Sequence, residues 1–429
     1  MKNSLGENLT VTIFGESHGP YIGVVLDGLA PGIPVNKDFI NHQLDLRRPA
    51  GKISTARVEK DQYIFASGVF NDKTTGTPLT ILIPNTVQHS KDYEKTAMLP
   101  RPGHADYTAN VKYHGFQDYR GGGHFSGRLT AALVAAGGLV IPELAKKGVK
   151  IASHIQSFGG IKDRDFQDYD DDIEALNQTN FAVLDSEKAR QMKEKAEAVA
   201  AEGDSLGGVL ETLVTGLPAG LGEPWFGTLE GLLSCALFSV PAVKGVQFGA
   251  GFDLVDGLGS QFNDQFKMEG GKIITKTNNN GGINGGISNG MPIIFRCAVK
   301  PTPSIYKQQN TVDMAKKIDA LLQIEGRHDP AIIHRARVVV DSVTALVLYD
   351  VMAGRYGTDF FGDAGSGAKI GTGGEILKQV QNDGDCRQND GLCGQNDGRS
   401  RHGNDDCGQG DFDSPDGSEF SPSHGSEWL

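Results

Sequence analysis

The stretch Thr10-Val-Thr-Ile-Phe-Gly-Glu-Ser-His-Gly-Pro20 decides the first question about the fold, because it contains a G-x-S-x-G pattern with a histidine beside the serine. In α/β-hydrolases this pattern follows a buried strand and leads straight into a helix. Here it leads instead into the apolar run 24–26, which Asp27 and Gly28 close. The stretch therefore predicts two strands, residues 10–14 and 23–26, joined by a glycine-rich turn, and argues against a hydrolase nucleophile at Ser17.

Segments with strand and helix periodicity are mixed along the rest of the chain. Further strands are expected at residues 63–70, 79–83, 209–215, 246–248, 272–275 and 293–299. Helices are expected at residues 37–46, 125–146, 186–202, 229–238, 312–324 and 343–352. Asp185 or Ser186 would cap the helix 186–202, which Gly203 would end. The pattern predicts an α+β or layered α/β protein with many glycine-rich connections.

Composition narrows the class of protein. The formal net charge of -12 argues against a nucleic-acid partner, since phosphate backbones are held by Lys and Arg patches. The apolar run 129–144 is shorter than a bilayer span and contains Gly137, Gly138 and Pro142, so no membrane segment is expected. The N-terminus shows no export signal, and the five cysteines form no C-x-x-C pair. We expect a cytoplasmic protein.

Residues 362–429 differ from the rest of the chain. They hold 13 acidic and 5 basic residues, a net charge of -8, which leaves -4 for residues 1–361. A Gln-Asn-Asp-Gly unit recurs at Gln381, Gln388 and Gln395, and branched apolar residues are scarce. Cys386, Cys393, Cys407 and His402 fit no zinc template, so no metal site is predicted. We expect a folded domain over residues 1–361 followed by a disordered acidic tail.

Several segments combine glycine, histidine and arginine, although the protein is acidic. They are residues 46–52, 101–106, 118–128, 278–286 and 326–330. Glycines let backbone N–H groups approach an anion, and arginine binds carboxylate or phosphate with two hydrogen bonds. Neither a Rossmann nor a P-loop motif occurs. The segments indicate a small polyanionic ligand, and His18, His104 and His328 are candidates for proton transfer.

Taken together, these segments resemble the chorismate synthase family. Residues 15–19 with 26–28 match its first signature, residues 121–128 its second in outline, and residues 326–330 its third. Segments between these signatures also match the family pattern, in the same order along the chain. The likeness runs from about residue 5 to about residue 355. The fold implied is a layered β-α sandwich with an internal pseudo-repeat, commonly assembled as a homotetramer.

Some positions depart from the commoner family pattern. In the second signature His124, Phe125, Gly127 and Leu129 replace the usual residues, while Ser126, Arg128 and Thr130 remain. Asp341 stands where glutamate is usual, and Pro241 where asparagine is usual. These departures bear on contacts with a flavin more than on the activity.

The resemblance implies a reaction and a cofactor. The reaction is the 1,4-anti elimination of phosphate and a ring hydrogen from 5-enolpyruvylshikimate 3-phosphate, which gives chorismate. Family members use reduced FMN, which is not consumed overall. No nicotinamide motif is present, so an external flavin reductase is expected, although reduction of the flavin by NADPH on this chain stays open.

The resemblance also implies roles for single residues. His18 resembles the histidine that protonates the reduced flavin, and His104 the one that assists the departing phosphate. Asp329 resembles the carboxylate that takes the ring hydrogen together with flavin N5, while Ser17 and Ser126 resemble polar residues that hold this relay in place. Anion binding falls to Arg47, Lys52, Arg128 and Arg327. FMN contacts fall to Ser126, Gly127, Arg128, Ala242, Gly286, Lys300, Pro301, Thr302, Pro303, Ser304 and Arg327.

Two other hypotheses stay open at this point. One is a flavin-independent phosphatase or phosphoryl-transfer enzyme that uses His104 or His18 on a small sugar phosphate. The other is a homologue that binds FMN or an anion and has lost its chemistry through the changes in the second signature. They predict, respectively, phosphate release without flavin and flavin binding without turnover.

Overall fold

The structure, a computed structural model, describes residues 2–49, 53–54, 61–86, 97–324 and 329–362. Lys52, Arg327, His328 and the segment 363–429 lie outside the described residues, so the predictions made for them stay predictions. The chain divides into two compact units, and the elements described below belong to the first, Met1–Lys369.

The opening stretch forms a β-hairpin at the centre of a five-stranded sheet. Strands β2 (Thr10–Gly15) and β3 (Tyr21–Asp27) pair antiparallel, with Thr10 opposite Asp27 and Gly15 opposite Ile22. The two strands and the turn predicted from the sequence are confirmed. The sheet has the order β1-β2-β3-β7-β4, in which the other strands are β1 (Ser4–Leu5), β4 (Ile64–Ser67) and β7 (Leu79–Pro84).

A second five-stranded antiparallel sheet is built from residues 150–299, after the strands of the first sheet. Its order is β11-β16-β10-β8-β9. The strands are β8 (Lys150–Phe158), β9 (Ile161–Lys162), β10 (Gly208–Thr215), β11 (Val243–Phe248) and β16 (Ile293–Val299). Smaller two-stranded ribbons are β5 (Val69–Phe70) with β6 (Lys73–Thr74), β12 (Phe266–Glu269) with β13 (Lys272–Thr275), and β14 (Ile283–Asn284) with β15 (Ile287–Ser288).

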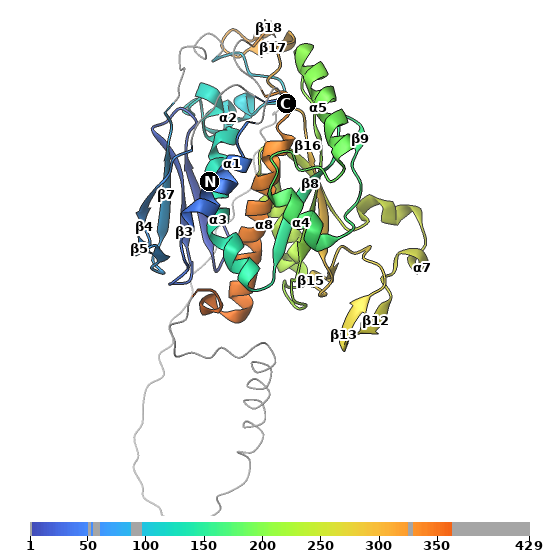
Figure 1. The fold of residues 1–429 in the computed structure, drawn as a ribbon. Helices are drawn as coiled ribbons and strands as arrows, with labels where there is room; N and C mark the ends of the chain where they lie inside the picture. Colours follow the sequence, from blue (N-terminus) through green and yellow to red (C-terminus); the bar gives the residue numbers. More distant parts are fainter. Residues whose placement is uncertain (1, 50–52, 55–60, 87–96, 325–328, 363–429) are drawn as a thin grey trace, which may run out of the picture. The chain divides into compact units, whose positions relative to one another are not determined.

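Two long apolar helices lie between the sheets. Helix α3 (Thr130–Lys146) contacts β3 and β7 of the first sheet, and helix α8 (Ile333–Tyr356) contacts β8 and β10 of the second. The two helices pack on each other, as Figure 1 shows. Each sheet is thus followed in the chain by one helix of the central layer. This arrangement confirms the predicted α+β class and the layered sandwich in which one pattern occurs twice.

Close contact between the two central helices depends on a glycine. A Cβ atom on Gly137 would lie 2.5 Å from Cβ of Ser342, so a larger residue would force α3 and α8 apart. The helical segment Gly127–Lys146 is long and apolar enough to cross a membrane by length and composition alone. In the structure 78% of its most apolar window is buried by protein, as in a core helix.

The remaining helices cover the edges and the outer face of the sandwich. Helix α1 (Lys37–Leu46) packs on α3, α6 (Leu229–Ser239) packs on α8, and α4 (Tyr169–Asn177) packs on the outer face of β8. Also described are α2 (Asp106–Lys112), α5 (Ser186–Ala201), α7 (Gly259–Phe262) and the 3-10 helices η3 (Arg120–Phe125), η4 (Gly127–Leu129), η5 (Trp225–Gly227), η6 (Gly251–Asp256) and η7 (Thr358–Phe360).

One predicted helix is wrong. Residues 312–324 carry apolar side chains at helical spacing, but the structure has a hairpin there, β17 (Gln309–Asp313) with β18 (Ile318–Leu322). The carboxylate of Asp313 accepts hydrogen bonds from the N–H groups of Ala315 and Lys316, and Lys317 adopts φ 56°. This side-chain-stabilised turn outweighs the helical pattern. Helix α8, in contrast, begins ten residues before its predicted start at residue 343.

Candidate active site

A polar cavity of about 320 Å³ opens where the central helices begin. It is lined by Arg47, Arg48, Pro49, Asp61, Ser126, Gly127, Arg128, Thr130, Val240, Pro241, Thr302, Ser304, Asp329, Ile332, Arg335, Ala336 and Val339. Four arginines face two aspartates, a formal excess of two positive charges in an acidic protein. The N-terminal end of η4 and α3, where helix dipoles favour anions, also faces the cavity. The cavity therefore suits an anionic ligand.

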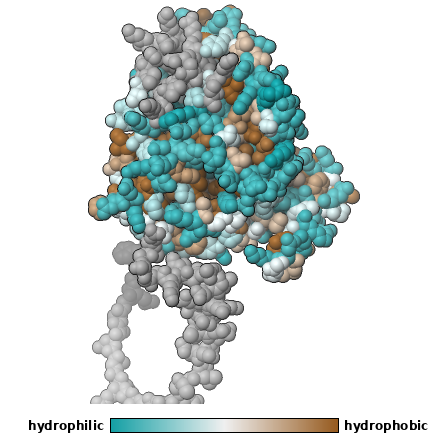
Figure 2. All heavy atoms as spheres, viewed as in Figure 1, coloured by the Kyte–Doolittle hydropathy of each residue, from teal (hydrophilic) through white to brown (hydrophobic). Residues whose placement is uncertain are grey.

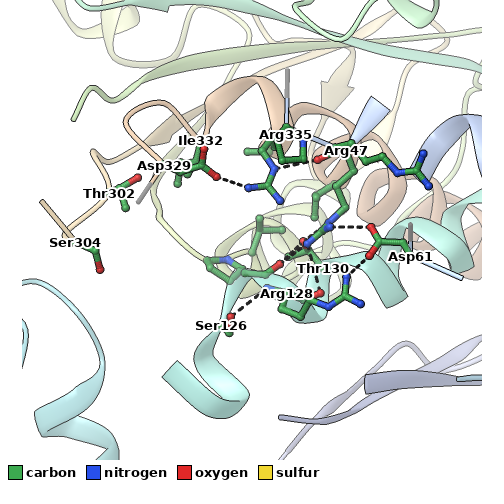
Figure 3. Close-up of a pocket in the computed structure, with 17 residues that line it drawn as sticks. Arg47, Asp61, Ser126, Arg128, Thr130, Thr302, Ser304, Asp329, Ile332 and Arg335 are labelled. Atoms are coloured by element: carbon green, nitrogen blue, oxygen red, sulfur yellow. Dashed lines mark hydrogen bonds and ion pairs between the residues drawn. The ribbon is translucent and has the colours of Figure 1, made fainter. Parts of the chain in front are cut away.

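Asp61 holds two of these arginines together, as drawn in Figure 3. Its carboxylate accepts from Nη1 of Arg47 at 3.2 Å and forms an ion pair with Nη1 of Arg128. Arg47 also donates from Nε to Thr130 Oγ1 at 2.9 Å and from Nη2 to the Gly127 carbonyl at 2.8 Å. Burial acts to raise the pKa of Asp61, but the charges of Arg47 and Arg128 outweigh it and hold that pKa below its ordinary value.

Asp329 lies on another side of the cavity and is paired with a cation. Its carboxylate forms an ion pair with Nη1 of Arg335, and Nε of Arg335 donates to the Arg47 carbonyl at 2.9 Å. Arg335 thereby connects the start of α8 with the end of α1. Arg47, Arg128, Asp329 and Ser126, which the sequence predicted at one site, do line one cavity.

The glycine-rich loop of η3 brings the two predicted histidines to the same place. A Cβ atom on Gly121 would lie 2.3 Å from Cε1 of His18, and one on Gly122 would lie 3.1 Å from Cε1 of His104. Both glycines have positive φ, +58° and +84°. Ser17 joins this group, because its N–H donates to the Gly123 carbonyl at 3.0 Å. Gly121 and Gly122 therefore each lie against one histidine that is a candidate for proton transfer.

His104 has an acidic partner of its own. Its Nδ1 lies 2.6 Å from Oδ1 of Asp106, whose two oxygens also accept from Nε and Nη2 of Arg101, both at 2.8 Å. Burial acts to raise the pKa of Asp106, but the hydrogen bonds from Arg101 and His104 outweigh it and hold that pKa far below its usual range. Asp106 is therefore a carboxylate at any working pH.

The segment 300–304 connects the histidine group with the cavity. Lys300 contacts the Gly103 carbonyl through its Nζ, and Arg101 donates from Nη1 to Ser304 Oγ at 3.3 Å. Thr302 and Ser304 line the cavity on the side away from Asp61 (Figure 3). Lys300 N donates to the carbonyl of Ala242, a residue with φ 74° that follows cavity residue Pro241. Of the predicted flavin contacts, five line the cavity: Ser126, Gly127, Arg128, Thr302 and Ser304.

Comparison with known proteins identifies the family. Residues 9–353 match the family model described as chorismate synthase. The chain belongs to the chorismate synthase family. The chorismate synthase of Pyrococcus abyssi is 45% identical over 345 residues, which are 80% of this chain and 96% of the relative. That of Aeropyrum pernix is 44% identical over 352 residues, 82% and 93% of the two chains.

Structure comparison agrees with the sequence comparison. A solved structure titled "Crystal Structure of Chorismate Synthase" superposes with a TM-score of 0.66 at 28% identity, and it covers 89% of this chain and 98% of the other. The layered sandwich is therefore the chorismate synthase fold, as the resemblance in the sequence predicted.

Not every residue expected from the chorismate synthase pattern joins the cavity. Gly286 lies beside the N-terminal end of α6, where its carbonyl accepts from Leu229 N at 2.9 Å. The cavity residues Val240 and Pro241 follow the opposite end of that helix, roughly 16 Å away at 1.5 Å per residue. Lys52 and Arg327 lie outside the described residues. The assignment of Gly286 to FMN stays a prediction.

Sequence reasoning missed three polar residues of this site. Asp61 lies 14 residues from Arg47 and 67 from Arg128, so no local motif marks it. Arg335 follows Asp329 by only six residues, but this spacing matches no motif that the sequence analysis used. Asp106 did carry a signal, since Arg101, His104 and Asp106 fall within six residues. The departures from the family pattern also find a partial explanation: His124 donates from Nδ1 to the Gly15 carbonyl at 2.8 Å, which fastens the η3 loop to the opening turn.

Proposed function

We propose that this chain converts 5-enolpyruvylshikimate 3-phosphate to chorismate by 1,4-anti elimination of phosphate, with reduced FMN as its cofactor. The observation that carries the proposal is the connection between the arginine-rich cavity and the histidine group: Arg101, which contacts His104, also donates to Ser304 of the cavity wall. A polyanionic substrate needs the cations, and a departing phosphate needs a proton donor close to them.

Substrate anions would be held by the cavity's arginines. Arg47 and Arg128 both form ion pairs with Asp61, and Arg335 forms one with Asp329. Each guanidinium is therefore oriented before a ligand binds. Pre-oriented donors spend less conformational entropy on binding than free side chains. The excess of positive charge favours a ligand with two carboxylates and a phosphate over a neutral one.

Features of the cavity wall fit a flavin phosphate and ring. Thr302 Oγ1 is buried and has no hydrogen-bond partner among the described residues, which leaves a polar group for a ligand to satisfy. Ser126, Gly127 and Arg128 form the first turn in front of α3, where a phosphate would be favourable. Bound reduced FMN would supply transient electron donation to the substrate.

Proton handling falls to the chain's own side chains. His104 in its charged form would donate from Nε2 to the leaving phosphate, because Nδ1 is occupied by Asp106. His18 is 5% exposed beside Gly121 and would exchange a proton with the flavin. Asp329, positioned by Arg335, would receive the ring hydrogen as a proton.

Assembly and environment complete the proposal. We propose a cytoplasmic homotetramer served by an external flavin reductase. Figure 2 shows a largely hydrophilic face with separate hydrophobic patches. Trp225 and Phe226 of η5 are 84% and 100% exposed, and Phe252 and Val255 of η6 are both 78% exposed. Large exposed apolar side chains of this kind support association with further copies of the chain.

An anaerobic assay with 5-enolpyruvylshikimate 3-phosphate separates the proposal from its rivals. Chorismate absorbance is followed with oxidised FMN, with FMN and dithionite, and without flavin. The proposal expects chorismate only with reduced FMN. Phosphate release without flavin would instead support a phosphatase, and FMN binding without turnover in any condition would support an inactive homologue.

A further inference from the structure

The contacts around His104 determine which of its nitrogens carries a hydrogen. Nδ1 lies 2.6 Å from Oδ1 of Asp106 and 3.0 Å from Nη2 of Arg101. Arginine is only a donor, and the ionised carboxylate of Asp106 is only an acceptor. If Nδ1 had a lone pair, that lone pair would face the carboxylate oxygen at 2.6 Å. Nδ1 therefore carries the hydrogen, and both Nδ1–H and Nη2–H point at Oδ1.

This assignment leaves Nε2 for chemistry. In neutral His104 the lone pair is on Nε2, and in the charged form Nε2 gains the transferable proton. A Cβ atom on Gly122 would lie 3.3 Å from Nε2, so the glycine keeps space open beside this nitrogen. Only the tautomer with hydrogen on Nδ1 lets the charged ring give up a proton at Nε2 and remain hydrogen-bonded to Asp106 afterwards.

We propose that Asp106 is a positioning residue for the elimination: held by Arg101, it fixes His104 with its hydrogen on Nδ1 and its exchangeable proton on Nε2. Asp106 is itself held by three hydrogen bonds from Arg101, two from the guanidinium and one from the backbone N–H at 3.0 Å. Arg101 also donates to Ser304 of the cavity wall. The expected change in kcat rests on the proposed function, whereas the assignment of the hydrogen to Nδ1 of His104 does not.

Asp106→Asn tests this role because the amide cannot satisfy both partners. Its oxygen would accept from Nε and the backbone N–H of Arg101, which places the NH2 group against His104 Nδ1. The ring would then switch to the tautomer with hydrogen on Nε2. We expect kcat to fall on the order of 100-fold with KM changed by less than about threefold, as for other groups that orient a catalytic histidine. Asp106→Glu should recover part of the loss.

Asp172→Asn is the matched control. Asp172 accepts two hydrogen bonds from Arg164, at 2.5 and 3.0 Å, and one from Gln167 N at 2.9 Å, but within the described part of the chain it has no hydrogen bond to a histidine. Its substitution removes the same kind of aspartate–arginine pair, and kcat should stay within about threefold. A kcat of Asp106→Asn within threefold of wild type would overturn the proposal.

A second measurement needs no turnover. Nitrogen-15 NMR of protein labelled at its 11 histidines, with His104 identified by its absence in His104→Gln, reports the tautomer directly. Hydrogen on Nδ1 of neutral His104 is expected, and hydrogen on Nε2 in the wild-type protein would overturn the proposal. If no chorismate forms under any condition, the proposed function fails, while this spectrum still tests the role of Asp106.

Discussion

Gly121 lies directly against His18: a Cβ atom on this glycine would be 2.3 Å from Cε1 and 2.5 Å from Nδ1 of the imidazole. The two residues are 103 positions apart in the chain and meet because η3 folds back onto the β2–β3 turn. Their contact explains why a glycine-rich loop and a histidine-bearing turn belong to one site.

Substitution of Gly121 by alanine should therefore displace His18 as well as strain the loop. We expect the free energy of unfolding to fall by about 2 kcal/mol and kcat to fall at least about 10-fold, because φ +58° is unfavourable for alanine and the methyl group overlaps the ring. Gly160→Ala is the control: φ is +84° there, and no atom of the described residues lies within 4 Å of the added Cβ. Equal kcat in the two variants would show that contact with His18 does not matter.

Asp61 should be needed for stability. Asp61→Asn leaves the buried guanidinium groups of Arg47 and Arg128 without a balancing charge, which typically costs about 3 kcal/mol. The matched control is Asp72→Asn, since Asp72 also has positive φ but pairs with Lys37 at the surface, where the cost should be under about 1 kcal/mol. Urea unfolding of both variants measures the difference. A loss below about 1 kcal/mol for Asp61→Asn would contradict the expectation.

His154 should give the protein a dependence of stability on pH. Burial acts to lower its pKa, but hydrogen bonds to Asp163 at 2.7 Å and Glu211 at 3.1 Å outweigh burial and raise it above 6.5. A raised folded-state pKa stabilises the fold below pH 6.5, and this contribution is lost as the pH rises through the folded-state value. Each tenfold gain in the proton affinity of the folded protein corresponds to about 1.4 kcal/mol.

Urea titrations between about pH 6 and pH 8.5 measure this contribution. The free energy of unfolding of the wild-type protein should decrease with rising pH more steeply than that of His154→Gln. Parallel curves for the two proteins would show that His154 does not titrate between these limits.

The folded unit should need its last aromatic residues but not the segment that follows them. Phe361 is 1% exposed and stacks on Tyr349 with ring centroids 3.9 Å apart, and Tyr349 Oη accepts from Ala30 N at 3.0 Å. Phe361→Ala should cost about 3 to 5 kcal/mol. A chain ending at residue 362 should keep its melting temperature and kcat, and a clear loss of either would contradict the prediction that residues 363–429 are dispensable.

Local signals explain why much of the fold was predictable from the sequence. Helix α1 has the predicted bounds because Asn36 caps it, accepting from Phe39 N at 3.0 Å, and its apolar residues recur on one face. Asp185 likewise caps α5 as predicted, accepting from Glu187 N and Lys188 N. The hairpin β17–β18 was missed because a turn at Asp313, set by its own side chain, overrides the spacing of the apolar residues.

The motifs predicted several of the residues that line the cavity, but a pairing between two of them could be read from the sequence only where a local turn joins the partners. His104 and Asp106 are two residues apart, and their pairing follows from the local turn before α2. Asp61 is 14 residues from Arg47 and 67 from Arg128, so their ion pairs exist only after the first sheet has packed on α3. Periodicity and motif spacing carry no information about such a contact.

The most direct test of the central claim is the product balance of an anaerobic reaction. Wild-type protein is mixed with reduced FMN and excess 5-enolpyruvylshikimate 3-phosphate, and chorismate, phosphate and flavin absorbance are measured at completion. The proposed function predicts one phosphate for each chorismate, many turnovers for each flavin, and flavin still reduced at the end. Phosphate released without chorismate, or chorismate formed equally well with oxidised FMN, would contradict it.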